Sequence, residues 1–386
     1  MRIRVIGGGP AGLLFALLAK RRFPGWDIEV AEQNPPDATF GFGVVFSQGA
    51  LAFLERDAPD LHAELTARMQ AWPMQRIVHR DEAIDIDGNG FSAIARLQLI
   101  QFLQARCRAA GVELQFGRRL ESLPRADLVV GADGLNSIMR GTQGFAPRVE
   151  WLTNKFVWYG TRQRFECLTL TFRECAHGAF VAHHYRYSPD MSTFIVECDA
   201  TTWRRAGLDR MDDAASRGYC ERVFAADLGG HALVSNNSTW RQFPLLSNDV
   251  WSAGNRVLIG DALRSMHFSI GSGTRLAFED AIALDRALGE ANGEVARTLE
   301  LFERSRRPVV EKLHAAANRS SHWYERLAEK MRLEPWELAY DYMTRSGRMT
   351  DARLAETAPR FMAGLQAARA ARSGAPVSSP AAPPPR

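Results

Sequence analysis

Three glycines near the N-terminus have the spacing of a phosphate-binding loop. Gly7, Gly9 and Gly12 form the pattern G-x-G-x-x-G, with Pro10 and Ala11 between the last two. In such a loop the first glycine permits a tight turn, the second lets the backbone approach a pyrophosphate, and the third lets a helix pack on a sheet. The N–H groups at the start of that helix attract phosphate oxygens. The glycines therefore predict a dinucleotide site, with an ordinary strand-to-helix turn as the alternative.

Three acidic residues follow predicted strands in the order that a nucleotide-binding protein needs. Glu32, followed by Gln33, lies twenty residues after Gly12, where its carboxylate can accept hydrogen bonds from a ribose diol. Asp133 precedes a glycine and Asp261 follows one, each directly after an apolar strand. Either aspartate alone could be an ordinary turn residue. The glycine loop by itself serves NAD and FAD equally.

Alternating strands and helices surround these motifs, and they predict an α/β fold. Residues 2–6, 13–20 and 27–32 read as strand, helix and strand, which is a βαβ unit. Residues 149–241 instead show short alternating strands, typical of an antiparallel sheet. In residues 84–89 the pair Asp87-Gly88 predicts a hairpin turn. A long helical pattern over residues 295–334 is expected to break around Pro308.

We expect a Rossmann-like domain assembled from three pieces, a mainly antiparallel sheet domain and C-terminal helices. The expected segments are residues 1–75, 96–148 and 249–298 for the nucleotide domain, 76–95 (a hairpin) and 149–248 for the sheet domain, 299–372 for the helices, and 373–386 for a disordered tail rich in Pro, Ala and Ser.

The composition of the 386-residue chain excludes several classes of protein. Hydrophobic residues make up 46% and charged residues 24%, as in ordinary globular proteins. The net charge of +4 is too small to argue for nucleic acid. Apolar runs are too short to cross a membrane, and no signal peptide precedes the first strand, so we expect a cytoplasmic protein. The five cysteines form no C-x-x-C pair, and we expect no metal site.

The motifs in this order resemble the three fingerprints of single-component (group A) FAD-dependent aromatic monooxygenases. That resemblance implies the para-hydroxybenzoate-hydroxylase-like fold, bound FAD, and NADH or NADPH as a transient co-substrate. It also implies that O₂ adds at the flavin C4a position and that the hydroperoxide hydroxylates an activated ring. Arg96 stands at the position of an arginine that contacts the FAD diphosphate, and Asp261 at that of the ribityl contact. A solvated helix-end charge is the alternative for Arg96.

Longer segments resemble one subgroup of that family, over about residues 1–360. The subgroup includes salicylyl-CoA 5-hydroxylases, the N-terminal half of anthraniloyl-CoA monooxygenase and, more distantly, the violacein-pathway tryptophan hydroxylase. The segments that carry the resemblance are residues 40–47, 154–161, 192–197 and 267–274. The resemblance implies an aroyl-CoA substrate, with tryptophan or another indole as the alternative. Arg264 and Phe268 replace the histidine and proline that the broader family usually has.

The candidate site residues around the ring come from the same segments. His267 is the candidate catalytic group, with a structural histidine as the alternative. Further cofactor contacts are expected from Gly271, Gly273 and Thr274, and substrate contacts from Phe46, His183, Trp240 and Phe268. Because neighbouring strand residues point to opposite faces, one of His183 and His184 could face the substrate and the other solvent.

The expected partners are O₂ and a small aromatic molecule, possibly as a CoA thioester. Arginines of the sheet domain are candidates for its phosphates, although an arginine run is more often a solvated face; they are Arg204, Arg205, Arg210 and Arg241. We expect a monomer or homodimer. A halogenase of this fold is disfavoured, because no Trp-x-Trp-x-Ile-Pro-like segment occurs.

Overall fold

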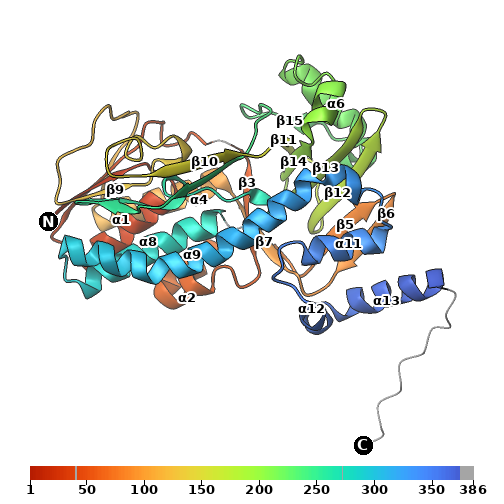
Figure 1. Ribbon diagram of the computed structural model, residues 1–386. Coiled ribbons are helices and arrows are strands. Elements are labelled where there is room, and N and C mark those ends of the chain that lie inside the picture. Colours follow the sequence, from red (N-terminus) through yellow and green to blue (C-terminus); the bar gives the residue numbers. More distant parts are fainter. Residues whose placement is uncertain (40, 272, 374–386) are drawn as a thin grey trace, which may run out of the picture.

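A mostly parallel sheet forms one end of the molecule (Figure 1). The computed structural model describes residues 1–39, 41–271 and 273–373. All neighbours in this sheet are parallel except β17 and β18. Its strand order is β17 (Ser252–Ala253), β18 (Arg256–Leu258), β9 (Leu128–Gly131), β1 (Arg2–Ile6), β2 (Asp27–Ala31) and β8 (Glu113–Gln115). The strands thus come from three separate parts of the chain.

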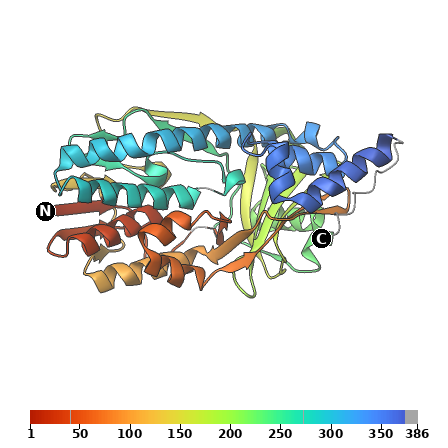
Figure 2. The ribbon, with the colours of Figure 1, turned by 90° about the horizontal axis from the view of Figure 1, so that it is seen from below.

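Helices cover this sheet and share its apolar core. Helices α1, α8 and α9 lie side by side when the molecule is viewed from below (Figure 2), and α4 packs against α1. Their apolar faces join one core with Val5, Val130 and Leu258 of the strands. The bounds are α1 (Pro10–Arg22), α4 (Arg96–Ala110), α8 (Gly273–Glu290) and α9 (Val295–Glu325).

A seven-stranded sheet forms the other end, and the antiparallel prediction for this region is correct. All of its neighbours are antiparallel except β12 and β5, which run parallel. The order is β15 (Leu233–Val234), β11 (Lys155–Thr161), β14 (Ser192–Cys198), β13 (Gly178–Arg186), β12 (Leu168–Cys175), β5 (Gln75–His79) and β6 (Glu82–Ile86). One face packs against the C-terminal helices and the other against α6 and its neighbours.

Two small sheets connect these ends. One has the order β3 (Gly43–Ser47), β7 (Phe91–Ala95), β4 (Gln70–Trp72), and the other pairs β10 (Pro147–Trp151) with β16 (Pro244–Asn248). The remaining helices are α2 (Ala52–Asp57), α3 (Pro59–Thr66), α5 (Ala200–Arg205), α6 (Asp213–Val223), α7 (Ala225–Leu228), α10 (Leu327–Lys330), α11 (Pro335–Thr344), α12 (Asp351–Thr357) and α13 (Pro359–Ser373). Ser373 begins the predicted tail but ends α13, and residues 374–386 lie outside the described residues.

The expected break at Pro308 is wrong, because Pro308 lies inside α9, an unbroken helix of 31 residues. Proline removes one backbone hydrogen bond and disfavours a helix interior. Here buried side chains on both sides of it, among them Phe302 and Val310, hold the helix against the core. Tertiary packing therefore outweighs the local preference.

The hairpin predicted at Asp87-Gly88 is also wrong. Strand β6 pairs with β5 and β7 pairs with β3 and β4, so the hairpin turn lies at residues 80–81 instead. The Asp87 carboxylate accepts hydrogen bonds from the backbone N–H groups of Arg360 (3.1 Å) and Phe361 (3.0 Å). It therefore caps the first turn of α13, a helix far away in the sequence.

We predict that Asp87→Ala weakens the attachment of α13. The two N–H groups would lose their acceptor, and removal of a helix cap costs about 1 kcal/mol. Hydrogen exchange of the α13 amides should rise, and the midpoint of thermal unfolding should fall by a few degrees. Asp87→Asn keeps an acceptor oxygen and is the matched control. Equal exchange in α13 for Asp87→Ala and the native chain would contradict this role.

Candidate active site

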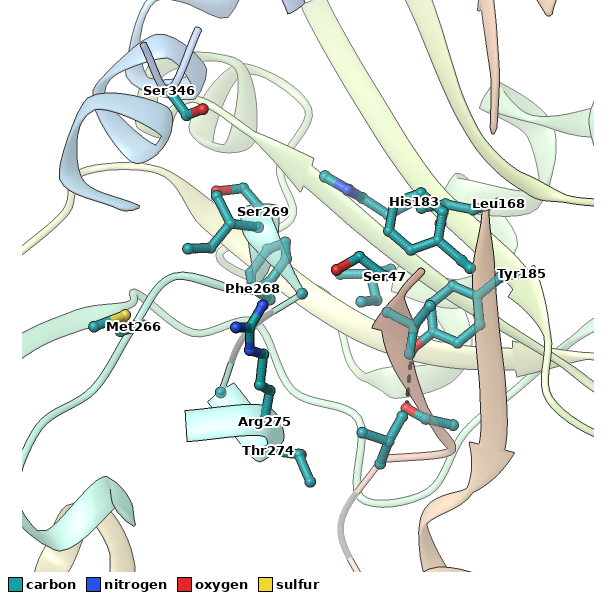
Figure 3. Close-up of a pocket in the computed structure, with 18 of the residues that line it drawn as sticks. Ser47, Leu168, His183, Tyr185, Met266, Phe268, Ser269, Thr274, Arg275 and Ser346 are labelled. Atoms are coloured by element: carbon teal, nitrogen blue, oxygen red, sulfur yellow. Dashed lines mark hydrogen bonds between the residues drawn. The ribbon is translucent and has the colours of Figure 1, made fainter. Parts of the chain in front are cut away.

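A cavity of about 600 Å³ lies where the two ends of the molecule meet. Its walls come from the loop before α1, from strands β3, β11 and β13, and from the segment between β18 and α8. Figure 3 shows Thr274 and Arg275 at the start of α8 on one side and His183, Tyr185 and Leu168 on the sheet opposite. The cavity thus joins the glycine loop to the antiparallel sheet.

The three loop glycines differ in the space that surrounds them. A Cβ on Gly7 (φ +105°) would lie 2.3 Å from the carbonyl oxygen of Ala132, and one on Gly12 would lie 2.2 Å from that of Gly7. A Cβ on Gly9 would meet nothing within 4 Å. Gly7 and Gly12 thus allow the helix to pack on the sheet, whereas Gly9 leaves space open. Gly9, Pro10 and Ala11 line the cavity, and the N-terminus of α1 has no side-chain cap.

Glu32 lies beside this loop, and Gln33 next to it is exposed. One carboxylate oxygen of Glu32 accepts the N–H of Gly8 at 2.7 Å, and the other accepts the backbone and side-chain N–H groups of Asn34. Neither Glu32 nor Gln33 is among the residues that line the cavity. Glu32 thus holds the glycine loop in place and keeps lone pairs free for a further donor.

Arg96 and Asp261 both line the cavity and act on each other electrostatically. The surrounding protein raises the pKa of Asp261, and the guanidinium of Arg96 partly offsets that shift. Asp133 is not among the lining residues; one of its oxygens accepts the N–H of Ile138 at 2.8 Å. Its other oxygen is buried without a partner among the described residues, and burial raises the pKa of this carboxyl group.

Arg264, one of the two departures from the family pattern, has a structural role. Its guanidinium donates to both oxygens of the fully buried Asp280, at 2.8 and 3.0 Å. Asp280 also accepts the backbone N–H of Gly260 and the guanidinium of Arg306. Burial alone would raise the pKa of Asp280, but the two guanidiniums outweigh it and hold the pKa below its usual range.

Aromatic rings form a chamber in the middle of the cavity. Phe268 lies 5.1 Å from Phe156, 6.2 Å from Trp158 and 6.2 Å from Phe243, measured between ring centroids. All four rings line the cavity. Tyr185 closes one side, and its hydroxyl donates to the carbonyl of Gly43 at 2.9 Å (Figure 3). Gly271, Gly273 and Thr274, the expected cofactor contacts, also line the cavity.

Two predicted substrate contacts lie elsewhere. Phe46 is fully buried in the core of the nucleotide domain against Phe278, because alternation along β3 turns Val45 and Ser47 to the cavity instead. Trp240 packs against the core beneath α6, and its indole N–H donates to Ser216 at 2.7 Å. Neither ring is among those that line the cavity.

His183 and His184 point to opposite faces of β13, as expected, but neither faces solvent. His183 lines the cavity, and its Nε2 is buried without a hydrogen-bond partner within the described part of the chain. His184 is buried on the other face, stacked on Phe194 and hydrogen-bonded to Thr171. Burial lowers the pKa of each imidazole to about 3, so both are neutral near pH 7.

A buried glutamate that the sequence analysis did not single out lies between two histidines. Glu197 Oε2 is 3.6 Å from His183 Nε2, and Glu197 Oε1 is 4.0 Å from His267 Nε2. Burial raises the pKa of Glu197 and lowers that of His267 to about 4. The strand register could have revealed the pair, because Ile195 is the partner of His183 and Glu197 lies two residues further on the same face.

His267 itself lies behind the cavity wall. It is not among the lining residues, and its ring packs 4.2 Å from Phe268 and 5.0 Å from Phe243, which do line it. Its Nδ1 accepts the N–H of Ser269 at 3.3 Å. His267 therefore does not line the cavity itself. It can act on the cavity only indirectly, through Glu197 and His183 and through the aromatic rings of the wall.

No group of three or more His, Cys, Asp or Glu side chains among the described residues could hold a metal ion. None of the described helices is both long and apolar enough to cross a membrane.

We predict opposite effects for alanine at two of the loop glycines. Gly9→Ala should keep the fold, because nothing lies near its Cβ, but should weaken cofactor binding about tenfold or more by filling the open space. Gly12→Ala should instead lower thermal stability, because its Cβ would collide with the backbone of Gly7. Flavin titration of apoprotein and thermal unfolding separate the two effects. Tight FAD binding by folded Gly9→Ala would contradict the assignment of this loop.

A family model described as an FAD binding domain matches residues 1–317. The chain is 40% identical to salicyloyl-CoA 5-hydroxylase of a Streptomyces species, over 90% of this chain and 70% of that protein. It is 38% identical to protodeoxyviolaceinate monooxygenase of Chromobacterium violaceum, over 89% and 94%. It is 37% identical to 3-hydroxy-4-methyl-anthranilyl-[aryl-carrier protein] 5-monooxygenase of Streptosporangium sibiricum, over 91% and 95%.

Solved structures agree on the fold. The crystal structure of p-nitrophenol 4-monooxygenase PnpA from Pseudomonas putida superposes with a TM-score of 0.73 at 17% identity, covering 93% of this chain and 96% of that one. At that identity the likeness establishes the fold alone. Together with the family match and the relatives, it leads to one conclusion: this chain belongs to the group A flavin monooxygenases and is an FAD-dependent aromatic monooxygenase.

Proposed function

We propose that this enzyme hydroxylates the ring of an aroyl-CoA thioester of the salicylyl-CoA type, using NADH or NADPH and O₂. The proposal rests on one observation: Gly9 of the glycine loop and the aromatic chamber around Phe268 line the same continuous cavity. Support for a carrier-linked substrate comes from two relatives, whose names give an aryl group joined to CoA and to a carrier protein. An ortho hydroxyl or amino group would activate such a ring.

The residues at the inner end of the cavity suit FAD. Gly9, Pro10 and Ala11 would face its diphosphate, and Arg96 adds a positive charge on the same wall. Gly271, Gly273 and Thr274 bring the N-terminus of α8 to the cavity, where its dipole favours negative charge. When bound, FAD would supply the redox chemistry, in which NAD(P)H, O₂, a proton and the aromatic substrate yield NAD(P)⁺, water and the hydroxylated product.

The protein's own groups would orient the ring and exclude water. The rings of Phe156, Trp158 and Phe268 form an apolar wall that suits an aromatic substrate. His183 lines the same space as a neutral imidazole, and its Nε2 has no hydrogen-bond partner among the described residues, so the ring can accept a hydrogen bond from a ring hydroxyl or amino group of the substrate. Glu197 and His267 lie behind it and would position that imidazole.

An indole substrate is the second candidate. The observation that favours it is the 38% identity to protodeoxyviolaceinate monooxygenase, which spans 94% of that protein. An indole would occupy the same aromatic chamber and would leave the outer part of the cavity without a substrate group.

Substrate-triggered oxidation of NADH and NADPH distinguishes the two candidates. We expect salicylyl-CoA or anthraniloyl-CoA to accelerate it and to yield a product heavier by one oxygen atom. Tryptophan should have no such effect. Acceleration by tryptophan alone would move the enzyme to the indole candidate, and no response to either thioester would contradict the proposal.

We predict that His183→Asn lowers the fraction of NAD(P)H consumption that ends in product, while the flavin spectrum is retained. The variant loses the imidazole that would orient the ring, so reduced flavin would react with O₂ unproductively more often. His184→Asn is the matched control, since that side chain points to the other face of β13.

The pH dependence gives a second readout for His183. Because the imidazole of His183 has a pKa of about 3, it should stay neutral between about pH 5 and 8. The coupling, meaning the fraction of NAD(P)H consumption that ends in product, should therefore not change with protonation of this histidine over that pH range in the native enzyme. Equal coupling for His183→Asn and the native enzyme would contradict the role of His183 in orienting the substrate ring.

A further inference from the structure

The cavity does not end at the aromatic chamber. It continues past Tyr342 and Met343 of α11 to the segment that joins α11 to α12. Arg348 on that segment and Arg353 on α12 line this outer end, and both are exposed. Arg275, near the start of α8, and Arg345 line the cavity as well. We call Arg348 and Arg353 the outer arginines.

No carboxylate pairs with Arg345, Arg348 or Arg353 among the described residues, whereas Arg275 has an acidic partner. Arg275 pairs with Glu279 at 2.8 Å. Arg345 is held by neutral groups, donating to Ser320 (2.9 Å) and to the carbonyl of Ser269 (2.7 Å) and lying 3.6 Å over the Tyr342 ring. No carboxylate lies within 4.0 Å of the guanidinium of Arg348 or of Arg353 in the described part of the chain.

The positive charges at this end repel one another. Partial burial lowers the pKa of Arg348, and repulsion from Arg275 and Arg353 lowers it further. Elsewhere the arginines of this chain commonly pair with acids, as Arg4 does with Asp27 and Arg173 with Asp227. A cluster that lacks such pairs and opens on the active-site cavity is suited to an anionic ligand.

The arginines that the sequence suggested for this purpose are placed differently. Arg204, Arg205, Arg210 and Arg241 are absent from the lining of the active-site cavity, and Arg205 lines a separate hollow beside Asp199. The cavity is also lined by neutral side chains such as Gln75, Met343 and Met349. A cavity lined by aromatic, neutral and cationic side chains suits a ligand with a ring, an uncharged spacer and phosphate groups.

We propose that Arg348 and Arg353, with Arg345 behind them, bind the phosphate groups of coenzyme A when the aroyl ring lies in the aromatic chamber. The proposal rests on the proposed function, since it assigns the carrier end of that substrate. Phosphate esters also occur in NADPH, and the same cationic end could bind that co-substrate instead. The test therefore separates the two sources.

The test compares two thioesters of the same ring. Salicylyl-CoA carries phosphates, whereas salicylyl N-acetylcysteamine thioester has the same ring and thioester but none. Charge-assisted hydrogen bonds are worth enough that Arg348→Gln and Arg353→Gln should each raise the KM for salicylyl-CoA about tenfold. The KM for the short thioester should stay unchanged. Arg204→Gln, an exposed arginine outside the cavity, is the matched control and should change neither.

Each other outcome overturns the proposal. An equal rise in KM for both thioesters would mean that the arginines act on the ring or on the fold. An unchanged KM for salicylyl-CoA would mean that they contact no phosphate of the carrier. A raised KM for NADPH, measured with the short thioester and without a change for NADH or salicylyl-CoA, would assign the arginines to the nicotinamide co-substrate.

A calorimetric titration of the holoenzyme with free CoA keeps this test independent of the proposed function. Should neither thioester trigger NAD(P)H oxidation, the proposed function fails, but CoA binding can still be measured. Binding by the native enzyme that weakens about tenfold in Arg348→Gln and not in Arg204→Gln would sustain the phosphate site. No binding by the native enzyme would overturn it.

Discussion

The arrangement of the active site depends on one buried carboxylate, that of Asp280. Asp280, on α8, accepts the Gly260 N–H and the Arg264 guanidinium, both from the segment after β18, and the Arg306 guanidinium from α9, so it joins three parts of the chain. An unpaired charge at this depth would be strongly destabilising, so these parts are held together as a unit. Gly260 leads directly to Asp261, and Arg264 leads to the loop that carries Phe268 and ends at α8, where Thr274 lies. The positions of these cavity-lining residues thus depend on this ion-pair cluster.

The parts of the fold that could be predicted are those encoded by short-range patterns. The glycine loop and the βαβ unit follow from the sterics of Gly7 and Gly12, which act on neighbours in space that the motif itself implies. Strand alternation correctly separated His183 from His184, because the two-residue period depends only on local backbone geometry. Gly271, Gly273 and Thr274, which line the cavity, were instead named from the resemblance of their segment to a family.

What could not be predicted depends on contacts between distant segments. The Asp87 carboxylate caps a helix that begins at Pro359, and the sequence around Asp87 contains no pattern that predicts this contact. Phe46 and Trp240 are aromatic residues of a suitable kind, but only the packing of β3 and α6 decides which way they face. Glu197 and the outer arginines became apparent only when the sheet and α11–α12 were placed around the cavity.

Helix α9 passes from one hydrophobic core to the other. Its first half packs with the nucleotide domain through Phe302 and Val310, and its last turn packs with the sheet domain through Trp323 and Tyr324. Adding or removing one residue between these halves would turn one face by about 100° relative to the other, since a helix has about 3.6 residues per turn. Related chains should therefore vary along this helix by substitution, and changes of length should fall in the loops that flank it.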